Sequence, residues 1–411
     1  MPPPPRTPEF EGYRVGEPGY RRIVIALFAA GLTTFALLYS TQALLPAFTG
    51  AFSVSAAEST LTVSLTTIGL GVALLAIGPL SEVVGRTRLI HLSLAASAVV
   101  ALACAVAPTW EALLGLRLLQ GVTLAGLPAV ATAYLREELH PGTHARAAGL
   151  YIGGTAIGGM TGRVVTGPIA EFTDWRWALA AVAVVGAVCA VVVRLLLPPS
   201  RGFAAVPARL GSLAGMLRRA LADPGLLALY AIGACSFGAF VAVFNAVGFR
   251  LTSPSFDLGL TAAGLIFLVY PLGTVGSIVA GRLADRFSRR AVVPIGCLVT
   301  VIGVQLTLPD SLPLLVLGLA VMTAGFFAVH GVASGWVPTR AHAGGVASGQ
   351  AAALYLFAYY LGSAVFGSLT GQAWTVGAWP GVVLLSSALL LVCGLLALWL
   401  RHTPSLDPPR R

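Results

Sequence analysis

Three side chains capable of electrostatic or acid–base chemistry lie inside long apolar stretches of this sequence. Arg117 follows Glu111 by six residues, and Arg163 precedes Glu171 by eight. On helices, the two arginines therefore lie ~9 Å and ~12 Å along the axis from these acidic residues. His330 lies within another apolar stretch. A guanidinium group attracts anionic or electron-rich groups, and an imidazole exchanges a proton near neutral pH. These residues predict a path for a small ligand or a proton.

Each of the three residues also has a structural interpretation. Arg117 would instead bond backbone carbonyls of the first helix or extend toward the nearer surface. Arg163 would pair with Glu171 or Asp174 at the end of its stretch. A histidine in an apolar helix is commonly just hydrogen-bonded, which is the alternative for His330.

Further polar and aromatic side chains within apolar stretches complete the candidate set for substrate binding or coupling. They are Tyr39, Gln42, Asn245, Tyr270, Gln305, Gln350, Tyr355 and Tyr359. No Asp or Glu lies in the middle of an apolar stretch. There is also no cluster of nucleophile, base and metal ligands, which argues against an enzyme within the membrane and predicts neither a metal nor a cofactor.

The composition requires a membrane around most of the chain. Of 411 residues, 57% are hydrophobic and only 10% are charged, whereas soluble proteins carry about 25% charged residues. The net charge of +10 does not indicate nucleic-acid binding, because the arginines lie in short links between apolar stretches. The five cysteines lie singly in apolar stretches and form neither a disulfide framework nor a metal motif.

Twelve apolar stretches are long enough to cross a bilayer as helices. They cover roughly residues 22–47, 57–81, 88–107, 111–134, 145–170, 175–197, 225–250, 260–283, 291–308, 312–337, 344–370 and 377–400. We predict a disordered tail (1–21), a six-helix bundle (22–197), a polar linker (198–224) that includes an interfacial helix, a second bundle (225–400) and a short tail (401–411).

The arginines predict the orientation of these helices. The chain has 25 arginines and no lysine. Arg176 and Arg250 fall on one side and Arg117 and Arg163 within spans, which leaves 21 on the side of the N-terminus. Cytoplasmic links carry the excess of basic residues, so both termini are predicted to be cytoplasmic.

A charged, glycine-containing loop occurs twice, 281 − 78 = 203 residues apart. In each copy a glycine is followed four residues later by an acid and eight later by an arginine. The first copy contains Gly78, Glu82, Gly85 and Arg86, and the second contains Gly281, Asp285 and Arg289. Tyr151, Gly158 and Gly167 likewise recur as Tyr355, Gly362 and Gly371, each 204 positions later.

The doubled loop resembles the signature of the major facilitator superfamily, found between helices 2 and 3 and again between helices 8 and 9. The family has Asp where this chain has Glu82. The resemblance implies twelve helices in two pseudo-symmetric bundles. It also implies that Glu82 and Asp285 act as latches against the starts of helices 11 and 5, closing the cytoplasmic side.

Two further motifs support this resemblance. Arg117 is followed by Gln120 and Gly121, which is similar to the helix-4 motif of the superfamily. The fifth stretch carries glycines every four residues on one face, which favours close helix packing; they are Gly154, Gly158 and Gly162. The stretch resembles the helix-5 motif of drug–proton antiporters, with Thr155 in place of the proline to which that family assigns its kink.

The resemblance is nearest to bacterial inner-membrane exporters of drugs and sugars. It implies a monomeric, multi-pass protein of the cell membrane that moves a small molecule by alternating access, with proton-coupled efflux. Import of a small organic anion or sugar is the alternative. A membrane-embedded enzyme or a sensor is the remaining class, for which the sequence offers neither a catalytic cluster nor an output domain.

Overall fold

The computed structural model describes residues 11–201 and 218–404. Within these ranges the chain consists of α-helices, short 3-10 segments and irregular links, with no β-strand. The predicted all-α class is confirmed for this part of the chain.

The first six spans form the N-terminal half. They are α1 (Pro18–Tyr39) followed by η1 (Gln42–Leu44) and α2 (Leu45–Phe52); α3 (Ala56–Val84); α4 (Arg86–Ala105); α5 (Trp110–Leu124) with α6 (Gly126–Glu138); α7 (His144–Phe172), after η2 (Pro141–Thr143); and α8 (Trp175–Leu196).

The other six spans form the C-terminal half. They are α10 (Pro224–Leu251); α11 (Leu260–Leu265) with η3 (Ile266–Val269) and α12 (Pro271–Arg286); α13 (Arg289–Leu306); α14 (Leu312–Ala343); and α15 (Ser348–His402), which contains two spans. Ten helical stretches of the described chain are long and apolar enough to cross a membrane. The division of α15 and the glycine-rich α7 bring the spans to the twelve predicted.

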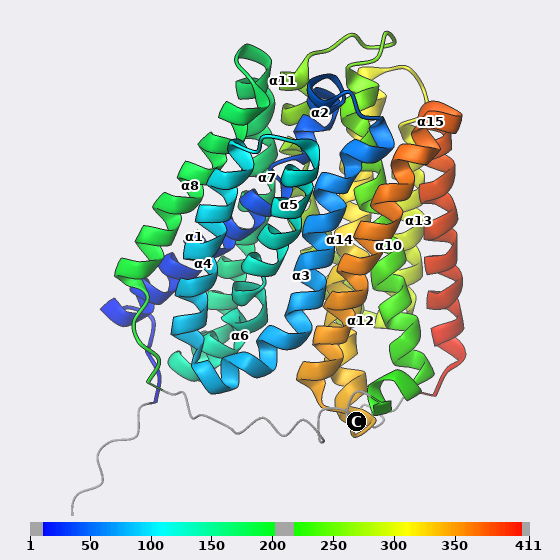
Figure 1. Ribbon diagram of the computed structural model, residues 1–411. Coiled ribbons are helices and arrows are strands. Elements are labelled where there is room, and N and C mark those ends of the chain that lie inside the picture. Colours follow the sequence, from blue (N-terminus) through cyan, green and yellow to red (C-terminus); the bar gives the residue numbers. More distant parts are fainter. Residues whose placement is uncertain (1–10, 202–217, 405–411) are drawn as a thin grey trace, which may run out of the picture.

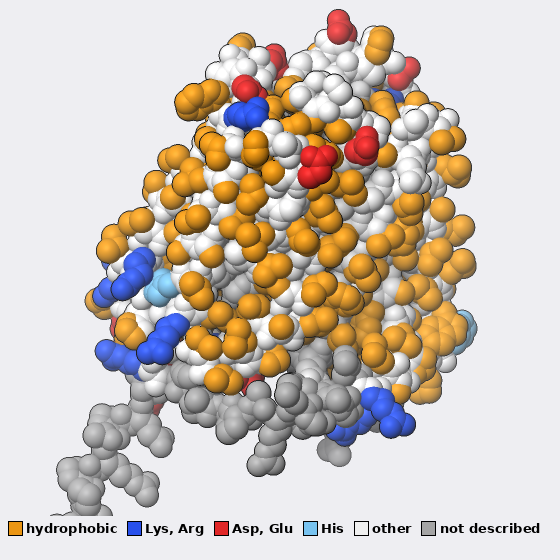
Figure 2. Space-filling view, in the orientation of Figure 1, with side chains coloured by type: hydrophobic (Ala, Val, Ile, Leu, Met, Phe, Trp, Pro, Cys, Tyr) orange, Lys and Arg blue, Asp and Glu red, His pale blue; other side chains and the backbone are white. Residues whose placement is uncertain are grey.

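The two halves stand side by side, with α3, α10 and the first part of α15 near the middle (Figure 1). We call the end where α1 begins and α15 ends the basic end, and the other the acidic end. Figure 2 shows arginines at the basic end, most of the acidic side chains at the acidic end, and a broad apolar surface between them. Such a surface suits the hydrocarbon core of a bilayer.

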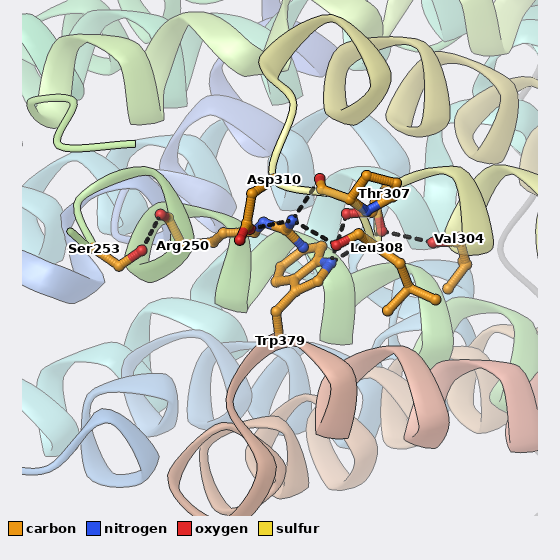
Figure 3. Close-up of polar contacts among 8 residues, drawn as sticks. Arg250, Ser253, Val304, Thr307, Leu308, Asp310 and Trp379 are labelled. Atoms are coloured by element: carbon orange, nitrogen blue, oxygen red, sulfur yellow. Dashed lines mark hydrogen bonds and ion pairs between the residues drawn. The ribbon is translucent and has the colours of Figure 1, made fainter. Parts of the chain in front are cut away.

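A cluster at the acidic end holds the break in α15 (Figure 3). Ala378 has φ 47 and ψ −142, outside the helical region, and the indole of Trp379 donates to the carbonyl of Thr307 at 3.1 Å. The guanidinium of Arg250 lies 4.6 Å from the Trp379 ring and donates to carbonyls of the α13–α14 link at 2.9 and 3.0 Å. These contacts offset the strain of a positive φ at a residue with a side chain.

The glycine face of α7 packs against α1, as its spacing predicted. A side chain at Gly154, Gly158 or Gly162 would collide with backbone carbonyls of α1, and each of these positions is buried. Glycine is required here because only its missing Cβ lets the two helix backbones approach this closely.

The segment before α1 and the link between the halves are described only in part. Tyr13 pairs through its backbone with the link between α6 and α7, and α1 begins at Pro18, four residues before the predicted boundary. Proline suits the first turn of a helix because backbone N–H groups there have no partner within the helix, so its lack of an N–H costs no hydrogen bond. The predicted interfacial helix of the linker falls largely on residues 202–217, outside the described residues.

Candidate functional site

The seam between the two halves is closed toward the acidic end, where α3 meets α15. The Ser368 hydroxyl donates to the Ser64 hydroxyl at 2.8 Å. The backbone at Gly371 touches Ala57, and Gly71 lies against Tyr360. These contacts recur every seven residues along one face of α3.

A second line of contacts closes the seam between α7 and the α11–α12 span. The backbone N–H of Thr261 donates to the Glu171 carboxylate at 2.5 Å. Gly167 and Gly264 pack backbone to backbone. Glu171 is thus engaged with the other half and does not pair with Arg163.

At the basic end the two signature loops have open space around their glycines. No atom of the described chain lies within 4 Å of where a side chain at Gly78 or Gly281 would begin. Gly78 continues the face of α3 that carries Ala57, Ser64 and Gly71, so the seam opens along this line. Asp285 is exposed in the last turn of α12, and Arg289 begins α13.

The first loop is held within its own half. Gly85 ends α3 with φ 98, a conformation that favours glycine, and Arg86 begins α4. Arg86 bonds the Glu137 carboxylate at 3.2 Å and also the Ser81 hydroxyl. Glu82 is half-buried and is an electrostatic neighbour of Glu137.

Arg117 is fully buried and its three guanidinium nitrogens all donate. Nε bonds the Thr62 carbonyl at 3.0 Å, while Nη1 and Nη2 bond the Leu37 and Leu38 carbonyls at 3.1 and 2.7 Å. Nη1 also bonds Gln120 at 2.6 Å. The last carbonyls of α1 have no partner within that helix. Arg117 therefore caps α1, the arrangement of the structural interpretation, and every one of these bonds stays within the N-terminal half.

Arg163 lies at the seam and is 1% exposed. Its Nε donates to the Gln42 side chain at 2.6 Å, and Nη1 donates to the Gly159 carbonyl. The guanidinium carbon lies 4.1 Å from the centre of the Tyr39 ring in its own half. It lies 4.6 and 4.7 Å from the rings of Phe267 and Tyr270 in the other half.

Gln42 and Asn245 join the halves directly. The Gln42 amide donates to the Asn245 side-chain oxygen at 2.6 Å, and the Asn245 amide donates to the Gly367 carbonyl at 3.3 Å. The two positions are 245 − 42 = 203 residues apart, the repeat distance of the signature loop. The pseudo-symmetry therefore places equivalent residues of α1–η1 and α10 in contact at the centre of the seam.

His330 belongs to an aromatic cluster of the C-terminal half. Its Nδ1 lies 3.0 Å from the Tyr355 hydroxyl, and its ring lies 4.6 Å from that of Tyr359. Tyr359 stacks on Phe237 with ring centres 3.7 Å apart. The structure thus brings His330, Tyr355 and Tyr359 together, and Tyr359 is an electrostatic neighbour of Arg163.

Several aromatic residues of this cluster were not among the candidates predicted from the sequence. Phe267 stands over Arg163, and Phe240 stacks on Phe326 with ring centres 4.1 Å apart. The signal was the recurrence of Phe at every third or fourth position of α10 (residues 237, 240 and 244), which defines one helix face.

Comparison with known proteins identifies the family. Residues 23–273 and 236–411 match the family model described as Major Facilitator Superfamily. A Bacillus subtilis (strain 168) protein named as an uncharacterized MFS-type transporter, YybF, is 41% identical over 387 residues, covering 94% of each chain. The chain belongs to the Major Facilitator Superfamily.

A second relative supports the assignment to this superfamily (MFS) over nearly the same length of chain. The inner membrane transport protein YnfM of Escherichia coli (strain K12) is 39% identical over 381 residues, which cover 93% of this chain and 90% of that one. The MFS protein described here is therefore a multi-pass membrane protein of a transporter family.

Solved structures share the fold. A bacterial homologue of the human lysosomal transporter Spinster, crystallised inward-facing and unoccupied, superposes with a TM-score of 0.73 at 15% identity, covering 94% of this chain and 95% of that one. The nucleoside transporter NupG gives a TM-score of 0.74 at 16% identity, covering 92% and 99%. At these identities the likeness establishes the MFS fold and nothing about the ligand.

Replacing Arg117 with alanine should reduce folding of this MFS protein. The substitution leaves buried carbonyls of α1 and α3 unpaired, at about 1–3 kcal/mol for each group. We expect a lower yield of monodisperse protein and a lower unfolding midpoint in detergent. Arg176→Ala is the matched control, since Arg176 bonds a single carbonyl, that of Ala107. Normal stability of Arg117→Ala, together with lost transport, would show instead that Arg117 acts on the substrate.

Proposed function

We propose that this MFS protein is a secondary active transporter that exports a drug or small metabolite by alternating access, coupled to proton entry. The asymmetry of the seam carries the proposal. Gln42 bonds across it at the centre, and Ser64 and Glu171 bond across it toward the acidic end. Gly78 and Gly281 at the basic end instead have open space beside them. This arrangement admits a ligand from the basic end, and rocking of the halves would admit it from the other.

The register of the closed part of the seam supports the latch at the open part. Gly71 faces Tyr360, and extending this antiparallel pairing by seven residues brings Gly78 to Ala353, because 78 + 353 = 71 + 360. The same rule brings Glu82 to Gly349 in the first turn of α15. A carboxylate is stabilised at the positive N-terminal end of a helix.

The second latch follows from the α7–α11 pairing. Gly167 packs on Gly264, and the same antiparallel register brings Asp285 to Arg146, because 285 + 146 = 167 + 264. Arg146 lies in the first turn of α7. Charge and helix dipole both favour this approach, so closure of the basic end would form two carboxylate latches.

His330 is the proton-coupling residue in this proposal. It lies at the centre of α14 and contacts Tyr355 of α15, so protonation would alter a contact between two helices of the same half. The glycine face of α7, which resembles that of drug–proton antiporters, supports export. Import of a small organic anion is the second candidate, and Arg163 at the seam favours it.

Both termini are proposed to be cytoplasmic, because 21 of the 25 arginines fall on the side of the N-terminus and only Arg176 and Arg250 on the other. A cysteine replacing Gly50 or Phe256 at the acidic end should react with a membrane-impermeant maleimide added to intact cells. A tag inserted in 202–215 should be protected until the cells are opened. Labelling of the tag in intact cells would reverse the orientation.

Transport by the purified full chain should depend on a pH gradient. In proteoliposomes, an imposed gradient should drive accumulation of compounds from a panel of drugs and metabolites, and the direction relative to the proton gradient should indicate antiport. His330→Gln should abolish the gradient-driven part and leave exchange without a gradient intact. His402→Gln, at the exposed end of α15, is the control. Gradient-independent movement of every compound would refute the coupling, and movement together with protons would favour the importer.

Cysteine pairs should distinguish the two ends of the seam. In a background without the five native cysteines, the pair Ser64→Cys and Ser368→Cys should crosslink readily. The pair Gly78→Cys and Ala353→Cys should crosslink at least ten-fold more slowly, because it requires closure of the basic end. Either crosslink should stop transport, and reductant should restore it. Unimpaired transport with both ends crosslinked would exclude rocking of the halves.

A further inference from the structure

We infer that the seam around Arg163 binds an aromatic monocarboxylate. The carboxylate would accept hydrogen bonds from Arg163 and neighbouring tyrosine hydroxyls, and the ring would lie against the aromatic cluster of the C-terminal half. This inference rests on the proposed transport function and gives that site a substrate class.

The first observation is an unused donor on Arg163. Nε and Nη1 donate to Gln42 and Gly159, whereas Nη2 has no hydrogen-bond partner among the described residues. Nη2 is also not fully sealed in the protein, unlike the partnerless hydroxyls of Tyr20 and Tyr230, although the residue is only 1% exposed. Arg117 provides the contrast, since its Nη2 bonds the Leu38 carbonyl at 2.7 Å.

The second observation is a group of tyrosine hydroxyls that, like Arg163 Nη2, have no hydrogen-bond partner among the described residues and are not fully sealed in the protein. They belong to Tyr39, Tyr270, Tyr359 and Tyr360, which are between 3% and 8% exposed. Within the described part of the chain none of these hydroxyls has a partner, and none is sealed from accessible space, as those of Tyr20 and Tyr230 are. A polar group at membrane depth must be satisfied by protein, water or ligand.

These donors lie close to one another. The Arg163 guanidinium lies 4.1 Å from the Tyr39 ring and 4.7 Å from the Tyr270 ring. Tyr359 is an electrostatic neighbour of Tyr39, Tyr270 and Tyr360, and also of Arg163. The free donors therefore lie near one another at the seam and come from both halves.

The chemistry of the donors selects the head group of the ligand. Arginine has donors only, and a tyrosine hydroxyl is readily oriented as a donor. A carboxylate accepts up to about four hydrogen bonds and pairs well with a guanidinium group. Arg163 supplies one positive charge to this group of donors, which balances a single negative charge and leaves a phosphate dianion undercompensated.

The aromatic cluster selects the rest of the ligand. Tyr359 stacks on Phe237. The Phe326 ring lies between those of Phe240, at 4.1 Å, and the half-buried Phe327, at 5.1 Å between ring centres. Flat rings pack against such surfaces by offset stacking or edge-to-face contact. A planar aromatic acid satisfies both the donors and this cluster.

Binding to the purified full chain in nanodiscs tests the inference without a gradient. Benzoate, cinnamate and indole-3-acetate are titrated calorimetrically beside cinnamamide, 3-cyclohexylpropanoate and phenyl phosphate. At least one aromatic acid should bind ten-fold or more tightly than all three comparison compounds. Equal binding of cinnamate and cinnamamide, preference for phenyl phosphate, or no binding of any aromatic acid would overturn the inference.

Variants assign the interaction to residues. Arg163→Gln should remove the preference for acid over amide, and Tyr359→Phe should weaken acid binding three- to ten-fold while its ring is kept. Tyr230→Phe is the matched control, since its hydroxyl is sealed in the protein, and should bind as wild type. If Arg163→Gln does not fold, Tyr359→Phe still decides: unchanged acid binding in that variant refutes the inference.

The outcomes separate this inference from the proposed function. Arg163-dependent binding of aromatic acids without any gradient-driven movement would leave the binding site in place and refute proton coupling. Gradient-driven transport of other compounds, with no binding of aromatic acids, would leave the transporter in place and refute the substrate class.

Discussion

The structure depends on how the unpaired backbone carbonyls at the end of α1 are hydrogen-bonded at membrane depth. α1 ends at Tyr39, and its last carbonyls have no partner within the helix. In a bilayer core such groups must be satisfied internally. Arg117 from α5 meets this requirement with bonds to the Leu37 and Leu38 carbonyls. The interruption, once capped, turns the chain so that Gln42 reaches the seam.

Pseudo-symmetry explains why the seam has this chemistry, and where it differs. Gln42 and Asn245 occupy equivalent positions and meet at the centre. Gln42 bonds Arg163, and Asn245 bonds Gly367. Gly367 is the repeat equivalent of Arg163, because 367 − 163 = 204 residues. One side of the repeat thus carries a guanidinium and the other carries no side chain. A symmetric frame therefore contains an asymmetric charge, and at the equivalent position Asn245, Val241 and Ser64 pack close to Gly367.

The number of spans and the packing face of α7 could be predicted from the sequence because both follow from local composition and period. The roles of the two arginines could not. Arg117 and Arg163 have similar depth and similar apolar neighbours in the sequence, and what separates them is the set of acceptors that each finds. Those acceptors lie on helices distant in sequence, Thr62 for one arginine and Gln42 for the other. The aromatic surroundings of Arg163 come from both halves and depend on the same long-range pairing.

The contrast between the arginines also bears on how the seam can open. Arg117 is bonded wholly within the N-terminal half, so rocking of the halves leaves its bonds intact. Arg163 is shared, since Phe267 and Tyr270 stand over it from the other half. A cation–π contact contributes about 2 kcal/mol when desolvated, and separation at the acidic end would replace it with water. A ligand carboxylate on Arg163 would offset that loss in the open state. The shared arginine thus links ligand charge to the position of the two halves, whereas the capping arginine keeps one half rigid enough to move as a unit.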